Sequence, residues 1–362
     1  MKAIGYQQNL PITDVNALQD IELPTPVVSG RDILVEVKAV SVNPADYKIR
    51  QDMPAEKDQW KVLGWDAAGI VKAVGDEVSL FNVGDKVWYA GDITRTGSNA
   101  QFQLVDERIV GKMPNSLSYA EAAALPLTTI TAWELLFDRL DVDRLDVDRL
   151  DVERLQGQRQ QENSSDSSAQ ELPAKKRILV IGAAGGVGSV MVQLIKQLTN
   201  LELIATASRP ETVSWLEDLG ADHIINHRNP LSEEFTVQSL AEVDYVVSLN
   251  NTEQHLVEIE KVIKPQGKFA LIDDPDTLNI MPFKMKSVSV HWEMMFTRSL
   301  FKTEDMQAQH ELLNAVSTLI DDSVIKTTVG NHFGTINATN LRQAHQLLES
   351  QKAKGKIVLE GF

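Results

Sequence analysis

Hydrophobic and polar positions follow a strand-like pattern through the first third of the chain. The segment DILVEVKAVSV (Asp32–Val42) alternates apolar and polar residues in part, as half-buried strands do. Two further apolar runs, AAGIVKAVGDEV (Ala67–Val78) and GDKVWYA (Gly84–Ala90), are bounded by glycine, asparagine or aspartate, which favour turns. These patterns predict a strand-rich N-terminal module.

The pattern becomes helical at Ser118. The segment SYAEAAALPLTTITAWELLF predicts an alanine-rich helix, a break at the proline and a second helix. Ser118 and Glu121 have the spacing of a capping box, which marks the start of the first helix.

From Lys176 onward, apolar runs typical of buried strands alternate with helical patterns. RILVIGA and LELIATAS predict strands, SVMVQLIKQL and ETVSWLEDLG predict helices, and the strands HIIN, VDYVVSL, GKFALID and SVSVHWE follow. This alternation is typical of a parallel sheet that is covered by helices on both faces. The final residues 341–362 predict a helix and a strand that rejoin the N-terminal module, since the sheet is already complete.

Between these two parts, Asp138–Leu155 repeats a five-residue unit in tandem. Leucine at every fifth position matches neither the helical period of about 3.6 nor the coiled-coil period of about 3.5. The next residues, Gln156–Glu171, are polar and low in complexity, which predicts a disordered loop. We therefore interpret residues 141–175 as a surface insertion that extends the preceding helix and packs no core. The alternative is an acidic interaction arm.

Length and composition narrow the class of protein. The chain has 362 residues, of which 43% are hydrophobic, and this suits two domains with a sizeable core. The formal net charge of −16 argues against binding to nucleic acid or to an acidic membrane, because both repel a negative surface. The absence of cysteine excludes disulfides, thiolate metal sites and a cysteine nucleophile. Without a signal core or a membrane span in the sequence, we expect a cytoplasmic protein.

The segment ILVIGAAGGVGS (Ile178–Ser189) carries the clearest functional signal, because it joins a predicted strand directly to a predicted helix. A dinucleotide site needs a tight turn there, a close backbone approach to the pyrophosphate and a helix N-terminus that faces it. Gly185 suits the close approach and Gly188 suits helix–strand packing, whereas Ala183 takes the place of the usual first glycine. The contacts expected from this turn are Gly185, Gly186, Val187 and Gly188.

The end of the next strand predicts which dinucleotide binds. NAD sites place Asp or Glu about 20 residues after the turn, where it holds the ribose 2′-hydroxyl. In this chain the strand LELIATA leads to Ser208 and Arg209, with no carboxylate at its end. A hydroxyl and a guanidinium suit a 2′-phosphate, so we expect NADP(H). The alternative is an N-cap serine beside a solvated arginine.

Several other stretches, together with AAGGVG, match one family. They are SVNPADYKIR, LGWDAAGIVKAVG, GDKVWYAG, AAALPLTTITAWELL, ATASRPET and GKIVLEGF. On these stretches the chain resembles the medium-chain dehydrogenase/reductase superfamily, and within it the zinc-free quinone oxidoreductases and the zinc-type alcohol-dehydrogenase-like group. The resemblance covers nearly all of the chain outside residues 141–175.

This resemblance implies an α/β protein of two domains. Residues 1–127 and 300–362 would form a GroES-like β-barrel that takes a small-molecule substrate. Residues 128–299 would form a doubly wound parallel (Rossmann) domain that binds NADP(H). We also expect a homodimer.

The resemblance predicts that there is no catalytic zinc. Zinc-containing members carry Gly-His-Glu where this chain has Gly64, Trp65 and Asp66, and their cysteine ligand has no counterpart in a chain without cysteine. A catalytic zinc needs three protein ligands, which Asp66 alone cannot supply.

The expected catalytic residues also come from the resemblance. An Asn-Pro-x-Asp motif that lies beside the nicotinamide in the family maps onto Asn43 and Asp46, and Lys48 stands where enone-reductase relatives carry a lysine that contacts cofactor and substrate. We expect Lys48 to place positive charge near an enolate oxygen, and Asn43 or Tyr47 to donate a hydrogen bond. The alternative is that Asn43 and Asp46 only fix the turn before a helix while Lys48 is solvated. For Asp46 we favour that structural role.

Further cofactor contacts are implied near the carboxyl ends of strands, where parallel sheets bind ligands. Thr128 belongs to a segment that approaches the nicotinamide. His227 matches a position that contacts the adenine-side phosphate or ribose, with a plain surface histidine as the alternative. The remaining expected contacts are Asn250, Asn251, Ile272, Met294 and Phe296.

Three functions remain open on this reasoning. The first is an NADPH-dependent, zinc-independent reductase of quinones or α,β-unsaturated carbonyls. The second is a zinc-free reductase of ketones or enoyl thioesters, and the third is a non-catalytic NADPH-binding protein. We favour the first, because hydride transfer to an electron-poor acceptor needs orientation and a stabiliser for the oxyanion but no metal.

Overall fold

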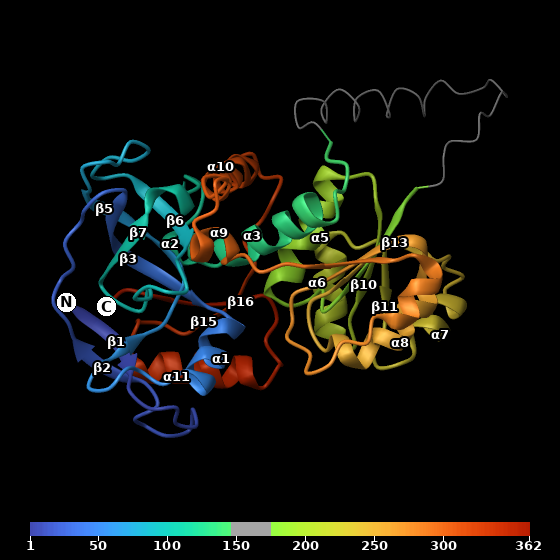
Figure 1. Cartoon of the computed structure of the whole chain (residues 1–362), viewed down its shortest axis with the longest axis horizontal. Helices are drawn as coiled ribbons and strands as arrows, with labels where there is room; N and C mark the ends of the chain where they lie inside the picture. The colour runs from blue at the N-terminus through green and yellow to red at the C-terminus, as the bar shows by residue number, and fades with distance from the viewer. Residues whose placement is uncertain (146–174) are drawn as a thin grey trace. The chain divides into compact units, whose positions relative to one another are not determined.

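A computed structural model describes residues 1–145 and 175–362, which divide into two compact units (Figure 1). Unit 1 comprises Met1–Thr131, Gly185–Val190 and Met294–Phe362, and unit 2 comprises Ala132–Ala184 and Met191–Glu293. The last part of the chain therefore belongs to the same unit as the first part.

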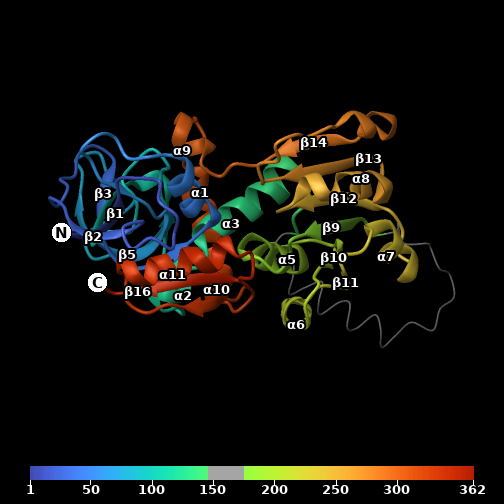
Figure 2. The same cartoon turned by 90° about the horizontal axis from the view of Figure 1, so that it is seen from below.

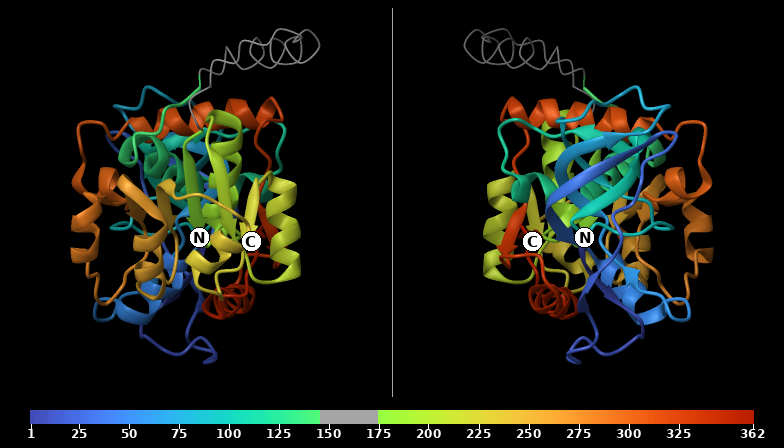
Figure 3. Two further views of the ribbon diagram at one scale, coloured as in Figure 1. Left: turned by 90° about the vertical axis from the view of Figure 1, so that its right-hand side faces the viewer. Right: turned by 90° about the vertical axis from the view of Figure 1, so that its left-hand side faces the viewer.

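Unit 1 is built on two sheets, whose blue and teal strands face the viewer in the right-hand view of Figure 3. The larger has seven strands in the order β15-β16-β3-β5-β6-β8, with β7 paired to β3, and the smaller is the antiparallel sheet β2-β1-β4. The strands are β1 (Lys2–Tyr6), β2 (Gln19–Glu22), β3 (Asp32–Val42), β4 (Lys61–Val62), β5 (Asp66–Val74), β6 (Lys86–Ala90), β7 (Phe102–Asp106), β8 (Val110–Lys112), β15 (Val329–His332) and β16 (Lys356–Glu360). The helices that begin in this unit are α1 (Pro44–Asp52), η1 (Glu107–Ile109), α2 (Tyr119–Ala123), α3 (Pro126–Trp133), α5 (Gly186–Leu198), α9 (Thr297–Phe301), α10 (Ala308–Asp321) and α11 (Ala338–Glu349).

The C-terminal strand β16 completes the larger sheet. It pairs antiparallel with β3, so that Ile357 lies opposite Val42 and Val358 lies opposite Ser41. The expectation that the end of the chain rejoins the N-terminal module is confirmed. The predicted strand over Asp32–Val42 is confirmed as β3.

The capping box at the start of α2 is also confirmed. The backbone N–H of Ser118 donates to the Glu121 carboxylate at 2.9 Å, and the backbone N–H of Glu121 donates to Ser118 Oγ at 3.3 Å.

Unit 2 contains a parallel six-stranded sheet, whose strands lie side by side from β14 to β11 in Figure 2. The order is β11-β10-β9-β12-β13-β14, with β9 (Arg177–Ile181), β10 (Glu202–Thr206), β11 (His223–Ile225), β12 (Val243–Ser248), β13 (Ile263–Leu271) and β14 (Ser289–Trp292). The helices are η2 (Glu134–Arg139), α6 (Pro210–Leu219), α7 (Leu231–Val237), α8 (Thr252–Val262) and η3 (Met281–Lys286). The order reverses at β9, and ligands of such sheets bind outside the carboxyl ends of the strands at that point. The predicted α/β class with a parallel sheet is confirmed.

One face of this sheet forms a continuous apolar core. Buried side chains from the strands pack against α7, α8 and η3, and they include Leu179, Val246, Phe269, Phe235, Ile259 and Phe283. Strands buried in this way read as apolar runs without alternation, which is why the sequence pattern identified them.

The start of the five-residue repeat packs within unit 2, so the expectation that the segment packs no core does not hold for Val142. Val142 is only 6% exposed, and the Arg144 guanidinium lies 5.0 Å from the centre of the Trp133 ring. The backbone N–H of Leu145 donates to Leu198 O at 2.9 Å. The preceding helix ends as the π-helix η2 at Arg139, the second residue of the repeat, and does not extend through residues 141–145. Residues 146–174, with the rest of the repeat and the predicted disordered loop, lie outside the described residues.

A buried histidine of α11 lies near Arg50 of α1 in unit 1. His345 is fully buried, and neither ring nitrogen has a hydrogen-bond partner among the described residues. Arg50 of α1 lies nearby and forms an ion pair with Glu349, the last residue of α11. Burial, together with a smaller effect of the Arg50 charge, lowers the pKa of His345 from about 6.5 to about 3. His345 is therefore neutral in the folded protein.

Replacing His345 by leucine is expected to improve stability in mild acid. The unfolded chain binds a proton at His345 below about pH 6.5 whereas the folded chain does not, so the free energy of unfolding falls as pH drops from there toward 3. His345→Leu removes this loss and two unpaired nitrogens, each of which destabilises the fold by about 1–3 kcal/mol. Urea unfolding at pH 7.5 and pH 5 measures the change. His332→Leu, at an exposed histidine, is the control, and an equal acid-induced loss in wild type and His345→Leu would contradict the prediction.

Candidate active site

The turn after β9 depends on Gly182. Its φ of +80° lies in the left-handed region that favours glycine, and a Cβ there would lie 2.5 Å from Asn250 Oδ1. Its backbone N–H donates to Thr206 Oγ1 at 3.1 Å. The ends of β9, β10 and β12 therefore meet at Gly182. The tight turn therefore lies at Gly182, one residue before Ala183, which takes the place of the usual first glycine.

The start of α5 is held close to two residues of unit 1. A Cβ on Gly186 would lie 2.8 Å from Lys356 Cδ and 3.1 Å from Thr128 Cγ2. The Thr128 hydroxyl donates to the carbonyl oxygen of Leu125, the residue just before α3, at 3.0 Å, so its proton is already engaged. Gly186 is thus needed for packing against Thr128 and Lys356, in addition to the phosphate contact that we expect from the turn.

Four basic side chains gather beyond β10 and β11, and we call them the basic cluster: Arg209, His227, Arg228 and His255. The rings of His227 and His255 are 6.4 Å apart between centroids, and Nδ1 of His227 is buried without a hydrogen-bond partner among the described residues. Burial is the largest cause of the lowered pKa of His227, and the charges of His255, Arg228 and Arg209 lower it further. Burial also lowers the pKa of His255, against the opposite effect of Asp273.

The basic cluster can hold a dianion. Arg209 forms an ion pair with Glu211 at 3.2 Å, and its side chain is 31% exposed. Ser208 is half-buried beside it. The sequence predicted Ser208, Arg209 and His227 but not Arg228 or His255. His255 stands in the first turn of α8, and its place after a strand end was a signal that could have found it.

The ends of β12 and β13 place the other predicted contacts. Asn250 packs against Gly182, and Asn251 precedes α8 with a φ of +51°. The backbone N–H of Ile272 donates to Ser248 O at 3.4 Å, which continues the strand pairing. Asn250 and Ile272 thus lie at the carboxyl edge of the sheet, where ligands of parallel sheets bind.

Asn43 is the N-cap of α1, and its side chain is locked. The Asp46 carboxylate accepts a hydrogen bond from the Asn43 backbone N–H at 2.7 Å, which completes a capping box. Asn43 Nδ2 donates to Asp66 Oδ2 at 2.8 Å, and Asn43 Oδ1 accepts a hydrogen bond from Lys356 Nζ. The structural role that we favoured for Asp46 therefore has a definite form, and Asn43 keeps only one side-chain N–H for other partners.

Lys356 and Asp66 form a buried ion pair that the sequence did not reveal. Nζ lies 2.9 Å from Asp66 Oδ2, and the side chains are 3% and 0% exposed. Asp66 Oδ1 accepts a hydrogen bond from the backbone N–H of Leu127 at 2.7 Å, at the start of α3. A lysine at the head of the buried strand β16 was the available signal, because a buried lysine needs a partner.

Asp46 lies beside this pair and has a strongly perturbed pKa. The pKa of Asp46 is raised to about 7, chiefly by burial and in addition by the charge of Asp66. The backbone N–H groups of Asn43 and Gly64 and the charge of Lys356 act in the opposite direction. The Asp46–Asp66–Lys356 group thus holds two acids and one base away from water.

Tyr47 and Lys48 follow Asp46 on α1. Both are half-buried, whereas Arg50 one turn further is fully buried. The structure therefore places all three predicted catalytic residues at the start of one helix, with Asn43 inside the protein and the other two partly open to solvent.

Trp65 occupies the position of the histidine ligand of zinc-containing relatives, and it is 2% exposed. Its ring meets Phe296 edge-on with centroids 5.8 Å apart, and Nε1 donates to Asp92 O at 3.2 Å. Phe296 is buried by this contact, while Met294 is exposed. The predicted contact at Phe296 thus packs against Trp65.

The residues around Trp65 do not fit a catalytic zinc. An indole cannot bind zinc, the Asp66 oxygens are engaged, and Asn43 Oδ1 already faces an ammonium. Across residues 1–145 and 175–362 no group of three His, Asp or Glu side chains could hold a metal ion.

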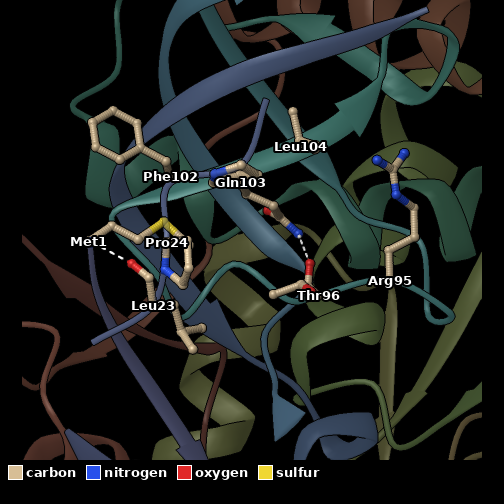
Figure 4. A pocket seen from close by; sticks show the side chains of 9 residues that line it. Met1, Leu23, Pro24, Arg95, Thr96, Phe102, Gln103 and Leu104 are labelled. Atoms are coloured by element: carbon tan, nitrogen blue, oxygen red, sulfur yellow. Dashed lines mark hydrogen bonds between the residues drawn. The ribbon is translucent and has the colours of Figure 1, made fainter. Parts of the chain in front are cut away.

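A separate pocket of about 260 Å³ lies in unit 1 and contains none of the predicted site residues (Figure 4). Met1, Leu23, Pro24 and Phe102 give it an apolar wall. Gln103 closes one side by donating to Thr96 O at 3.0 Å. We assign no part of the reaction to this pocket.

Comparisons with known proteins agree with this architecture. Residues 29–131 match the alcohol dehydrogenase GroES-like domain, and residues 219–359 match the zinc-binding dehydrogenase family. A zinc-type alcohol dehydrogenase-like protein of Staphylococcus aureus is 37% identical over 362 residues, which cover 99% of each chain. The chain belongs to this zinc-type alcohol dehydrogenase-like family of the medium-chain dehydrogenase/reductase superfamily. It is therefore an oxidoreductase of a family that uses NAD(P)H.

Solved structures show the same fold. A putative zinc-dependent alcohol dehydrogenase protein from Rhizobium etli is 53% identical with a TM-score of 0.89, covering 100% of this chain and 98% of that one. Quinone oxidoreductase of Escherichia coli, solved with NADPH, is 22% identical with a TM-score of 0.76, covering 99% and 100%. The predicted family and the GroES-like and Rossmann domains are confirmed. No helix in the described parts of this family member is long and apolar enough to cross a membrane.

Replacing Asp66 by asparagine is expected to destabilise this protein strongly. The change leaves the buried Lys356 ammonium without its counter-charge, and breaking such a pair costs about 3–5 kcal/mol of unfolding free energy. The double variant Asp66→Asn/Lys356→Met removes both charges and should regain much of the loss. Urea unfolding of the wild type, both single variants and the double variant measures the coupling. Additive losses would show that the two groups do not stabilise each other.

Proposed function

We propose that the protein is an NADPH-dependent, zinc-independent reductase of quinones or α,β-unsaturated carbonyl compounds. The observation that carries this proposal is the occupation of the zinc-ligand region by the Trp65 ring and by the Lys356 ammonium. Without a metal to polarise the carbonyl, an acceptor that is already electron-poor needs the least activation by the protein. Quinones and conjugated carbonyls meet this condition.

The basic cluster supports NADPH as the cofactor. Arg209, Arg228, His227 and His255 suit a 2′-phosphate, whereas an NAD site would need a carboxylate to hold the 2′-hydroxyl. Gly182 forms the tight turn that leads to the start of α5, and a helix N-terminus after such a turn is where the pyrophosphate of a dinucleotide binds. The E. coli quinone oxidoreductase of the same fold was solved with NADPH, which accords with this assignment.

The residues of α1 supply the electrostatic part of the proposed reaction. Bound NADPH supplies a hydride to the electron-poor carbon, and a proton from solvent completes the reduction. The Lys48 ammonium stabilises the negative charge that develops on the acceptor oxygen. The free N–H of Asn43 and the Tyr47 hydroxyl act as additional donors. A preorganised donor of this kind stabilises the transition state more than the ground state.

Arg209→Ala is expected to weaken NADPH binding while NADH binding stays nearly constant. The variant removes a guanidinium that we assign to the 2′-phosphate, and such charge-assisted contacts contribute about 1.5–3 kcal/mol. Fluorescence titration gives the Kd of each cofactor. Arg108→Ala, which removes an arginine paired with Asp106 in unit 1, is the control. Equal Kd values for NADPH and NADH in the wild type would refute the cofactor assignment.

Lys48→Met and Asn43→Ala are each expected to lower kcat for an enone by about 10²–10³, with a smaller loss for a quinone, because quinones need less help from the protein. NADPH oxidation assays with enones, quinones and ketones measure the effect, and the Kd for NADPH should change little. Lys72→Met, at an exposed lysine paired with Glu36, is the control.

The same assay with a chelator tests zinc independence. Turnover should persist, and elemental analysis should find no stoichiometric zinc. Loss of both zinc and turnover on chelation would contradict the proposal. Wild-type activity in both Lys48→Met and Asn43→Ala would show that other hydrogen-bond donors stabilise the negative charge on the substrate oxygen.

A further inference from the structure

The buried ammonium of Lys356 has no part in the reaction as proposed so far. It donates to three acceptors: Asn43 Oδ1, Asp66 Oδ2 at 2.9 Å and Val42 O at 3.4 Å. An ammonium has three N–H groups, so all of its donors are engaged within the protein. Any influence that Lys356 has on the reaction must therefore act through one of these partners.

Among the partners, Asn43 is the one that we place in the reaction. An amide side chain can point either way, and only its hydrogen-bond partners decide which end carries the N–H groups. Lys356 can only donate and the Asp66 carboxylate can only accept. Asn43 Oδ1 therefore faces Lys356, and Nδ2 faces Asp66 at 2.8 Å. A flipped amide would set N–H against the ammonium and oxygen against the carboxylate.

The aliphatic part of the Lys356 side chain, which we call its stem, is also held in place by packing. A Cβ on Gly186 would lie 2.8 Å from Lys356 Cδ, so the stem packs directly against the first residue of α5. The strand pairing of β16 with β3 fixes its backbone beside Val42, the residue before Asn43. Lys356 thus has little freedom to move away from the Asn43 amide.

We propose that Lys356 is a positioning residue for Asn43. Its ammonium, which is paired with Asp66, fixes the orientation of the Asn43 amide. The second side-chain N–H of Asn43 is thereby kept available to donate a hydrogen bond to the oxygen of the substrate that accepts the hydride. This proposal rests on the proposed function. Lys356 itself touches neither substrate nor cofactor in this assignment. The lysine and Asn43 then act as one unit in catalysis.

A double-mutant cycle on turnover tests this role. Lys356→Met should lower kcat for an enone by about the same factor as Asn43→Ala, which is about 10²–10³. In the Asn43→Ala background, Lys356→Met should cause no further loss, because the group that it positions is already absent. Lys356→Arg, which keeps donors and charge, should recover part of the turnover. A multiplicative loss in the double variant, or wild-type kcat in Lys356→Met, would overturn the proposal.

Stability is separated from positioning by the charge-neutral variant Lys356→Met/Asp66→Asn. It removes the unpaired charge and should fold even where Lys356→Met does not. Its asparagine can both donate and accept, so it no longer determines the orientation of Asn43. We expect a folded variant with low kcat, and wild-type kcat in this variant would overturn the positioning role.

An NMR measurement that does not depend on turnover tests the orientation of Asn43 separately from the proposed enzymatic function. In protein labelled with ¹⁵N at asparagine, the Asn43 side-chain signal, assigned from its absence in Asn43→Ala, should show one strongly protected hydrogen. In Lys356→Met/Asp66→Asn that signal should shift and its exchange with solvent should speed up. If the wild type reduces no enone or quinone, the proposed function fails, and the NMR result alone decides whether Lys356 orients Asn43. An unchanged signal in the variant would refute the orientation itself.

Discussion

The buried ion pair between Lys356 and Asp66 is the constraint on which the candidate active site depends. Two charges are tolerated away from water only when they are paired and their remaining hydrogen-bonding groups are satisfied. Four segments meet this condition together: β16 brings Lys356, β5 brings Asp66, the start of α1 brings Asn43, and the start of α3 brings the Leu127 N–H. The two ends of the chain are thus joined at the site itself.

The same pair accounts in part for why the residues around Trp65 do not fit a catalytic zinc. The oxygens that a metal would use are already bonded to an ammonium and to backbone or amide N–H groups. Trp65 adds an apolar ring, packed edge-on against Phe296, where a ligand would have to stand. At this position the chain has a network of hydrogen bonds and one ion pair in place of metal ligands. The proposed reaction is accordingly one whose acceptors need no Lewis acid.

The parallel sheet imposes a second constraint, on the cofactor side. Its carboxyl edge brings together groups that lie far apart in the sequence, because each strand ends at the same edge. Asn250 packs on Gly182, and His255 lies beside His227, although each pair is separated by other elements. Local patterns identified Arg209 and His227 as single candidates. Arg228 directly follows His227 in the sequence, whereas the approach of His255 to these residues depends on the strand order, which no local pattern contains.

The sequence alone determined the features that depend on neighbours along the chain. These are the strand over Asp32–Val42, the capping box at Ser118, the strand-to-helix break at the glycine-rich turn and the exclusion of thiolate ligands. Each follows from periodicity, from hydrogen bonds between residues close in sequence or from composition. The sequence did not show which residue of the turn after β9 has a positive φ, because a residue pattern does not report backbone angles. In the structure that residue is Gly182.

Only the tertiary structure decided the features that depend on distant partners. In the sequence, Lys356 is an ordinary lysine at the start of an apolar strand. Only the structure shows that its ammonium contacts Asp66 and Asn43. The sequence placed Val142 and Arg144 in a surface insertion. In the structure Val142 is buried and the Arg144 guanidinium packs on the Trp133 ring. In both cases the free energy of a buried side chain is set by the atoms around it, and those atoms come from segments whose proximity is fixed by strand pairing and helix packing rather than by the local sequence.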